Sequence, residues 1–454
     1  MADARSDAGR RPLFDDAFRR VLGAIRDGTL VDDRDYDLLE LCERYSLHPA
    51  ELDGALQRLA DIGLARPLPG AVVRFTRLDP LAWAEGGWLL VGLLEVAMRA
   101  TVPVATDQDL ERYERLVDVA RRAAAERGDE LDPAVFATLA FWADRTPNLL
   151  TARLLVRTLE QVRYGLTTAS PWQVTGIEPW AASSLQALRL KDPSSAEHAA
   201  HVFRRLWGHH LEQSARSWGL DPVALVHPAR VPNDDADRNV PQADDVWLEL
   251  LGSVRDGTLQ RGQEYTIRGL AARLRVPVQR LLPMVRRLET MGLVRAGDDR
   301  NGSILVATTT VTDWAETIGL LLGLQEMCMR ATVPALSEDD RDGFDSLVRR
   351  IRWQARTRDH AYTSSLLELN RFFAERCPDQ TLRRTTTIMI SRLAYVLPEA
   401  PAFRQWDTDD FLQLLSDAVR TGDADAASEA CHALAVHFDA HVDDVTARYG
   451  TMGP

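Results

Sequence analysis

Apolar residues recur at helical spacing, and they do so in the same order in the two halves of the chain. In the second half, an apolar helical period covers 246–254 and a short amphipathic segment follows at 266–276. A longer helical period then runs from about Val276 to Gly292, followed by a turn and an apolar strand. The first half repeats this order. Three helices followed by a hairpin predict a winged helix-turn-helix in each half, over residues 11–80 and 246–310.

Longer helical periods follow each of these modules. From Trp83 to about Leu220, and again from Trp314 onward, apolar residues keep the spacing of amphipathic helices, with short breaks at Pro, Gly and Asp. The pattern predicts two all-helical bundles, over residues 81–226 and 311–454. Between them, the segment 227–245 is rich in Pro, Asp and Asn without an apolar period, and we interpret it as a linker.

Near-identical stretches indicate that one unit of about 230 residues occurs twice. Arg26–Leu30 recurs at an offset of 229, as Arg255–Leu259, and Met98–Pro103 recurs unchanged at an offset of 231. Matched residues are thus separated by 229 positions in the first part of the unit and by 231 in the rest, a regularity that is hard to obtain by chance. The change falls between Leu64 and Trp83, where we expect a surface loop. Further pairs at the larger offset are Trp83 with Trp314, Tyr164 with Tyr395, His201 with His432 and His210 with His441.

Composition narrows the class of protein. With 45% hydrophobic and 27% charged residues, the 454-residue chain has enough apolar material for several cores. The apolar run from Trp88 to Met98 is short and contains Glu95, so we expect no membrane span and a cytoplasmic location. The four cysteines lack the spacing of a metal cluster. Because GxSxG, HExxH, GxxxxGK[ST] and strand-linked GxGxxG motifs are absent, we predict that the protein is not an enzyme.

Charge separates the two predicted helix-turn-helix modules. The net charge of −13 argues against indiscriminate coating of nucleic acid. Residues 11–80 hold 10 Arg and 13 acidic residues, whereas 241–310 hold 10 Arg and 8 acidic residues. The second module is therefore the better candidate for binding nucleic acid, although its arginines also suit the solvated faces of amphipathic helices. The candidate DNA-binding residues are Arg268, Arg273, Arg275, Gln279, Arg280, Arg286, Arg295 and Arg300.

The order of short helix, DGTL, two helices, Gly-Leu and hairpin resembles the GntR family of bacterial transcriptional regulators, and each helical half resembles its FCD (FadR C-terminal) effector domain. The resemblance covers nearly the whole chain, twice. It implies that the third helix of each module enters the major groove, that the wing lies along the backbone, and that the bundles bind a small-molecule effector. The mainly α fold would then comprise two winged helix-turn-helix domains and two FCD-like bundles.

Both modules depart from the family pattern in the third helix. Where an arginine followed by a glutamate is usual, the first copy has Asp53 and Gly54, and the second has Leu282 and Pro283. We expect Glu51 and Asp53 to face phosphates with the wrong sign, and Pro283 to remove a helical hydrogen bond.

The resemblance also implies a place for a metal ion, held by one aspartate and three histidines. At the expected histidines the two copies carry Ala137 and Glu368, and a further one aligns near Ala181, so we predict that this metal site is lost and that there is no cofactor. His201 and His210 are nine residues apart and point to opposite sides of a straight helix. The candidate ligand-pocket residues are Arg99, Trp142, His201, His210, Arg330, Phe373, His432 and His441.

Regulators of this family typically act as homodimers, which suggests a role for the duplication. We expect one chain to form an internal pseudo-dimer, either alone or as a dimer of chains, and to bind an asymmetric DNA site because its two third helices differ. The leading hypothesis is a ligand-responsive transcriptional regulator with DNA and an unknown small molecule as partners. The alternative is a protein that has lost DNA binding and acts as an interaction or ligand-binding protein or a repurposed enzyme. The acidic first module, Pro283 and the −13 charge favour this alternative.

Overall fold

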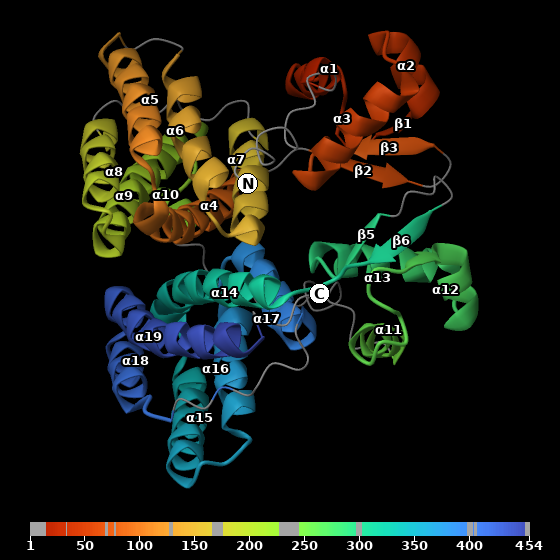
Figure 1. Ribbon diagram of the computed structural model, residues 1–454. Helices are drawn as coiled ribbons and strands as arrows, with labels where there is room; N and C mark the ends of the chain where they lie inside the picture. Colours follow the sequence, from red (N-terminus) through yellow and green to blue (C-terminus); the bar gives the residue numbers. More distant parts are fainter. Residues whose placement is uncertain are drawn as a thin grey trace. The chain divides into compact units, whose positions relative to one another are not determined.

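The computed structural model describes residues 15–32, 34–68, 71–76, 79–126, 130–165, 176–226, 245–296, 302–396, 403 and 406–449. These residues form two compact, mainly α units that divide after Val226, with Asn148–Thr151 grouped with the second (Figure 1). The predicted linker, 227–245, lies outside the described residues apart from Asp245, which begins a helix.

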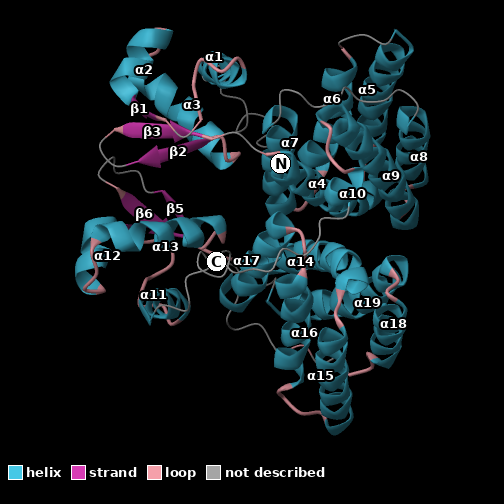
Figure 2. Cartoon of the chain, turned by 180° about the vertical axis from the view of Figure 1, so that it is seen from behind, coloured by secondary structure: helices cyan, strands magenta, loops and turns pink. Residues whose placement is uncertain are grey.

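Unit 1 begins with three helices and a small antiparallel sheet of order β1-β3-β2 (Figure 2). Its elements are α1 (Asp15–Arg26), β1 (Asp35–Asp37), α2 (Leu38–Tyr45), α3 (Pro49–Asp61), β2 (Ala65–Leu68) and β3 (Val72–Phe75). Apolar side chains from every element meet in one core, in which Val21, Leu41, Leu59 and Phe75 are fully buried. The strand β1 was not predicted, because in its three residues only Tyr36 faces the core and no apolar period develops.

Local sequence sets the boundaries of the second and third helices. The Asp37 carboxylate accepts hydrogen bonds from the backbone of Leu39 and Glu40 and so caps α2. His48 and Glu51 form a reciprocal capping box at the start of α3. Between the two helices, Ser46 takes a left-handed conformation with φ of 51°. A tight turn therefore separates α2 from α3, as a helix-turn-helix requires.

The remainder of unit 1 is a helical bundle. It consists of α4 (Pro80–Thr101), the 3₁₀ turn η2 (Val102–Val104), α5 (Asp107–Glu126), α6 (Leu131–Arg145), α7 (Leu149–Gly165), α8 (Ile177–Leu190), α9 (Pro193–Trp218) and α10 (Pro222–Val226). The helix α4 packs chiefly against α9 and also against α6. The segment Pro80–Val104 is long and apolar enough to cross a membrane by length and composition, but 67% of its most apolar window is buried in the protein. It is the central helix of this bundle.

Unit 2 repeats the order of elements. Its first part comprises α11 (Asp245–Arg255), β4 (Glu264–Thr266), α12 (Ile267–Arg273), α13 (Val278–Thr290), β5 (Val294–Ala296) and β6 (Ser303–Val306), with sheet order β4-β6-β5. The bundle comprises α14 (Val311–Thr332), η4 (Val333–Ala335), α15 (Glu338–Thr357), α16 (Tyr362–Arg376), α17 (Gln380–Val396), α18 (Asp409–Thr421) and α19 (Ala424–Tyr449).

Equivalent elements also agree in length and in their internal contacts. The helices α4 and α14 both have 22 residues, α5 and α15 have 20, and α9 and α19 have 26. The Arg145–Asp109 ion pair of unit 1 spans 3.0 Å, and at the positions 231 residues later Arg376 and Asp340 are 2.7 Å apart. The two units thus share buried and charged contacts as well as topology.

The pairing of residues in the two sheets shows where the separation between equivalent residues changes from 229 to 231. Tyr36 pairs with Val73 in unit 1 and Tyr265 pairs with Ile304 in unit 2, so β3 and β6 are already related by an offset of 231. The strands β2 and β5, whose first residues are Ala65 and Val294, still keep the offset of 229. The two extra residues of unit 2 therefore fall within the hairpin, between its two strands.

One close helix contact shows how the two bundles have diverged. A Cβ atom built on Gly87 of α4 would lie 1.7 Å from the Trp207 ring of α9. The equivalent positions in unit 2 hold Ile318 and Phe438, which belong to one cluster. A large ring above a glycine is thus replaced by a smaller ring above an aliphatic side chain, as conservation of core volume requires.

We expect Gly87→Ala to destabilise unit 1, because the added methyl group has no space under Trp207. The free energy of unfolding should fall by about 1–3 kcal/mol, measured as a lower Tm in thermal unfolding. Gly23→Ala in α1 is the control, since nothing lies within 4 Å of its added Cβ, and it should raise stability by about 0.5–1 kcal/mol. Adding Trp207→Phe to Gly87→Ala should restore part of the loss. Equal Tm values for both alanine variants would contradict this account of the α4–α9 contact.

Candidate functional site

Six of the candidate DNA-binding residues surround the helix-turn-helix of unit 2 and are exposed. Two lie on α12, one in the turn, two in the first turn of α13 and one on β5, in the order Arg268, Arg273, Arg275, Gln279, Arg280 and Arg295. Arg286 lies on α13, and its side chain is outside the described part. Arg300 also lies outside the described residues. The structure therefore brings six polar side chains to the surface of one small module.

The turn between the two helices has the same geometry in both units. Arg275 adopts a φ of 53°, close to the 51° of Ser46. After each turn, the next backbone N–H donates to a carbonyl five residues earlier over 2.9 Å, from Val276 to Ala271 and from Leu47 to Cys42. Because the backbone is shared, the difference between the units lies in the side chains that this frame carries.

The proline in the second third helix does not end it. Pro283 removes one backbone donor, yet α13 runs without interruption from Val278 to Thr290. Leu281 and Leu288, on either side of the proline, are fully buried in the module core. This packing stabilises the helix although one backbone hydrogen bond is missing. The exposed start of α13 therefore keeps its helical conformation.

The third helix of unit 1 presents a different surface. The Glu51 carboxylate accepts a 2.9 Å hydrogen bond from the backbone of His48, so it caps its own helix and keeps a negative charge at the start of α3. Asp53 is exposed, as its position in the helix suggested. The wing arginine Arg74 is held 2.7 Å from Asp35 of the neighbouring strand.

Equivalent positions show where the charge difference arises. Arg268, Arg275 and Arg280 of unit 2 stand where unit 1 has Leu39, Ser46 and Glu51. Within the described residues, the side chains of unit 2 that make no ion pair include Arg268, Arg273, Arg275 and Arg295. Cations without a carboxylate partner remain available to an external anion, and phosphate is the anion that a row of arginines fits.

Each module is docked on its own bundle through one helix. In unit 1, the Arg58 guanidinium on α3 binds both oxygens of Glu160 on α7, with Nε 2.9 and 3.1 Å from them. The same guanidinium lies over the Phe18 ring, 4.0 Å from its centroid. Tyr164, also on α7, packs edge-on against Phe18 at 5.6 Å. A salt bridge and two ring contacts thus connect the third helix to α7.

Unit 2 uses the equivalent helix with different chemistry. Arg287, at the position of Arg58, lies 4.6 Å from the centroid of Trp247, and burial followed by the charge of Arg384 lowers its pKa. Arg392 of α17 donates to the backbone carbonyl of Met291, the C-cap residue of α13, and over 2.9 Å to Thr317 of α14. In both units a movement of this bundle helix would be passed to the third helix of the module.

The predicted ligand-pocket residues divide into three groups, of which the first is core. Trp142 is fully buried and donates from Nε1 to the Tyr113 hydroxyl over 3.3 Å. Phe373, at the equivalent position, is equally buried and packs against Phe344 at 5.8 Å. These rings fill the interior of their bundles.

The second group comprises two histidines enclosed by aromatic rings. His210 is 3% exposed and lies 5.6 Å from Trp83 and 5.3 Å from Trp207. His441 lies at the same 5.6 Å from Trp314. Burial, with a smaller contribution from His209, lowers the pKa of His210 to about 4, and burial also lowers the pKa of His441. A neutral imidazole is therefore part of each core.

The third group lies on another side of the same long helices. In unit 2, His432 Nε2 is 3.2 Å from an oxygen of Glu326, and the other oxygen of that carboxylate is 3.5 Å from Arg330. Arg330 also pairs with Asp425 at 2.8 Å. In unit 1, His201 lies with Glu95 and Glu197. The prediction had identified the histidines and arginines of this group, but had given none of the glutamates a role.

A signal for these glutamates was present in the sequence. Glu95 and Glu326 are related by the same offset of 231 as the two histidines, and each stands four residues before Arg99 or Arg330. Glu160 and Arg392 gave no such signal, because they belong to contacts that the two units make with different residues.

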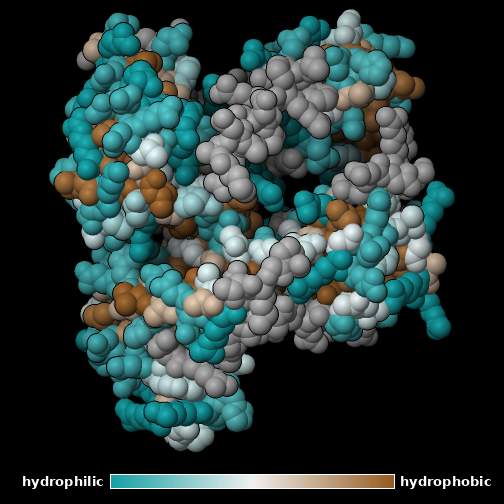
Figure 3. All heavy atoms as spheres, in the orientation of Figure 1, coloured by the Kyte–Doolittle hydropathy of each residue, from teal (hydrophilic) through white to brown (hydrophobic). Residues whose placement is uncertain are grey.

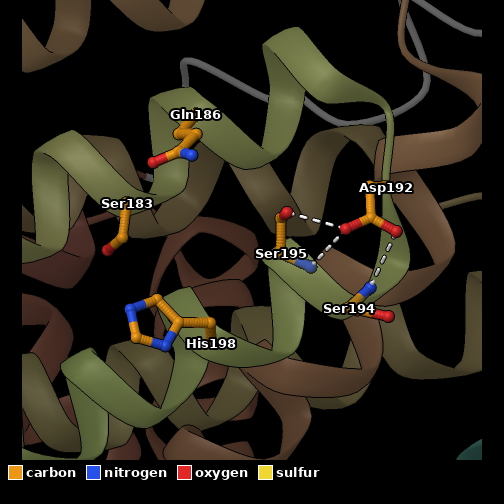
Figure 4. A pocket seen from close by; sticks show the side chains of 6 residues that line it. All are labelled: Ser183, Gln186, Asp192, Ser194, Ser195 and His198. Atoms are coloured by element: carbon orange, nitrogen blue, oxygen red, sulfur yellow. Dashed lines mark hydrogen bonds between the residues drawn. The ribbon is translucent and has the colours of Figure 1, made fainter.

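A polar groove of about 350 Å³ lies between α8 and α9, and none of the predicted ligand-pocket residues lines it. Its lining comprises Ser183, Gln186, Asp192, Ser194, Ser195 and His198 (Figure 4). The Asp192 carboxylate accepts from the backbone of Ser195 over 2.9 Å and from its hydroxyl over 2.7 Å. These bonds satisfy the start of α9, so the groove is explained by helix capping. On the face seen in Figure 3, hydrophobic surface forms only small separate patches.

No protein-family model matches the sequence, and no curated protein matches it either. Among solved structures, the chain is similar to Lar of Listeria monocytogenes, which controls expression of the agr system, with 14% identity and a TM-score of 0.33 over 47% of this chain and 99% of that one. It is also similar to Escherichia coli McbR/YncC, with 16% identity and a TM-score of 0.34 over 46% and 100%. For GntR of Streptococcus agalactiae the identity is 16% and the TM-score 0.25, over 42% and 98%.

The buried histidine of unit 1 predicts acid sensitivity. Since the pKa of His210 falls from 6.5 to about 4 on folding, the unfolded chain binds the proton more tightly. The stabilisation is complete above pH 6.5 and is lost as the pH falls toward 4, by up to about 3 kcal/mol. His210→Phe should remove this part of the pH dependence of unfolding by denaturant, whereas the exposed neighbour His209→Asn should keep it. A wild-type slope retained in His210→Phe would show that another group is responsible.

Proposed function

We propose that the chain is a DNA-binding transcription regulator that arose by tandem duplication, and that unit 2 makes the main contact with DNA. The observation that carries the proposal is the set of exposed arginines on α12, the turn, α13 and β5. A helix-turn-helix places the start of its third helix in the major groove and the preceding helix across the backbone. Gln279 and Arg280 then take the positions of base-reading residues, and the remaining arginines take those of phosphate contacts.

Unit 1 is proposed to contribute less to this binding. Its third helix begins with a capping box in which Glu51 occupies the position of Arg280. Asp53 adds a negative charge to the exposed side, and Arg74 is neutralised by Asp35. Because the two third helices differ, a site read by both would be asymmetric. A target bound through unit 2 alone would be a half-site.

The bundles are proposed to control the modules in response to a small molecule. The Arg58–Glu160 pair and the Arg392–Met291 hydrogen bond tie each third helix to α7 or α17. A ligand that shifts either helix changes the placement of the docked module, provided that it binds one arrangement better than the other. The effector must reach residues other than Trp142 and Phe373, whose rings are already enclosed by core side chains.

Matched charge reversals test the DNA-binding proposal. Arg273 and Arg44 occupy equivalent, exposed positions on α12 and α2. We expect Arg273→Glu to weaken binding to DNA from the gene's own upstream region by about 10-fold or more and to reduce the salt slope by about 1. Arg44→Glu should change the affinity by less than about 2-fold. Fluorescence polarisation over a series of salt concentrations measures both quantities.

Two outcomes would count against the proposal. Wild-type protein that fails to bind this DNA at low salt would favour the alternative, in which the fold has lost DNA binding. An equal loss in Arg44→Glu and Arg273→Glu would assign the two modules equal roles. Arg280→Glu provides a second variant at the start of α13, with Asp53→Arg as its counterpart in unit 1.

We also propose that the two units of one chain replace the two subunits of a homodimer. A closed dimer needs one self-complementary interface, and a duplicated chain can supply both halves of it. The expected result of light scattering is therefore the mass of a single chain, 50.7 kDa, at micromolar concentration. A stable complex of twice that mass would instead assign the interface to pairs of chains.

A further inference from the structure

Three potential metal ligands converge on one side of the bundle of unit 1. Glu95 comes from α4, whereas Glu197 and His201 are four residues apart on α9 and therefore share one face of that helix. One carboxylate oxygen of each glutamate and a ring nitrogen of the histidine all lie within 4.8 Å of one another. Glu95 is 8% exposed, and the other two residues are half-buried.

This group is separate from the interior of the bundle. On the same helix, Phe203, Trp207 and His210 face the core and are almost completely buried. Glu197 and His201 follow a neighbouring, partly exposed stripe. None of the positions at which the sequence resemblance placed histidines, Ala137 and Ala181 among them, belongs to the group.

The chemistry of the group suits a divalent cation. Two carboxylates close together repel each other unless a positive charge lies between them. Carboxylate oxygens and imidazole nitrogens bind Zn²⁺ at about 2.0–2.2 Å, and tetrahedral ligands at that radius are about 3.4 Å apart. The three ligand atoms lie within 4.8 Å of one another, so each must move closer by at most about 1.4 Å to reach this geometry. Three protein ligands leave a fourth position for water or another donor.

The equivalent group of unit 2 lacks one of the two carboxylates. At the position of Glu197 stands Ser428, whose hydroxyl donates to an oxygen of Glu326. Arg330 and His432 approach the same carboxylate at 3.5 and 3.2 Å. Ser428, Arg330 and His432 therefore all contact the Glu326 carboxylate. In unit 1 the counterpart of Arg330 is Arg99, which makes no ion pair among the described residues.

We propose that unit 1 binds one divalent transition-metal ion through Glu95, Glu197 and His201. The duplicated glutamate and histidine supply two ligands at equivalent positions in both units. Ser428 at the position of Glu197 removes the third ligand from the equivalent group of unit 2. The proposal does not depend on DNA binding, since the ion is held within one bundle.

Zinc binding by the full chain tests the proposal. Metal-free protein is titrated with ZnCl₂ in a calorimeter, and the bound metal is counted by elemental analysis after dialysis. We expect one Zn²⁺ per chain. Glu197→Ser, which gives unit 1 the residue of unit 2, should weaken binding by at least about 10- to 100-fold, because loss of a ligand costs no less than loss of a residue that only orients one. His201→Gln should have a similar effect.

A control on the same helix separates this site from general histidine binding. His198 is exposed, lies one residue from Glu197 and belongs to the polar groove (Figure 4). His198→Asn should bind Zn²⁺ as the wild type does. Both ligand variants change half-buried side chains, and circular dichroism establishes that they remain folded. Absence of bound zinc in the wild type, or equal binding by Glu197→Ser and His198→Asn, would overturn the proposal.

Discussion

The packing of α4 against α9 in unit 1, and of α14 against α19 in unit 2, positions most of the side chains described above. In unit 1 this contact brings α4 and α9 close enough for the Trp207 ring to lie directly over Gly87. It also places His210 between Trp83 and Trp207, inside the core. On another side of the same two helices, Glu95 meets Glu197 and His201. One packing contact therefore determines both the aromatic core and the charged group at its edge.

Constraints on that contact explain how the two units diverged. Core volume must be conserved, so the exchange of Gly87 for Ile318 is accompanied by the exchange of Trp207 for Phe438. Charge must also be balanced, and the exchange of Glu197 for Ser428 accompanies an ion pair from Arg330 to Glu326. Coupled changes of this kind leave the helix frame unchanged. They allow two similar bundles to carry different charged groups within one chain.

Docking of each module depends on a more variable contact. The helices α7 and α17 approach the third helix of their own module in both units, yet a carboxylate makes the contact in one and a buried arginine makes it in the other. Tyr164 and Tyr395, at equivalent positions, pack against the module core in both. Apolar packing is thus common to both units, and the polar bonds differ. Such a difference would let the two modules respond unequally to changes in their bundles.

Sequence patterns alone predicted the three helices and the hairpin of each module and the all-helical character of each bundle, because helical periodicity and a repeated offset are local properties of the chain. They also identified the second module as the more basic one, and they placed His201 and His210 on opposite sides of a helix. They missed β1, whose three residues are stabilised by pairing with a strand 35 residues later. Only the tertiary structure decided that Glu51 caps α3, and that Glu95 lies beside a histidine more than 100 residues away. The physical reason is that these arrangements depend on how separate helices pack and on which way a side chain turns, and neither is recorded in the spacing of residues along the chain.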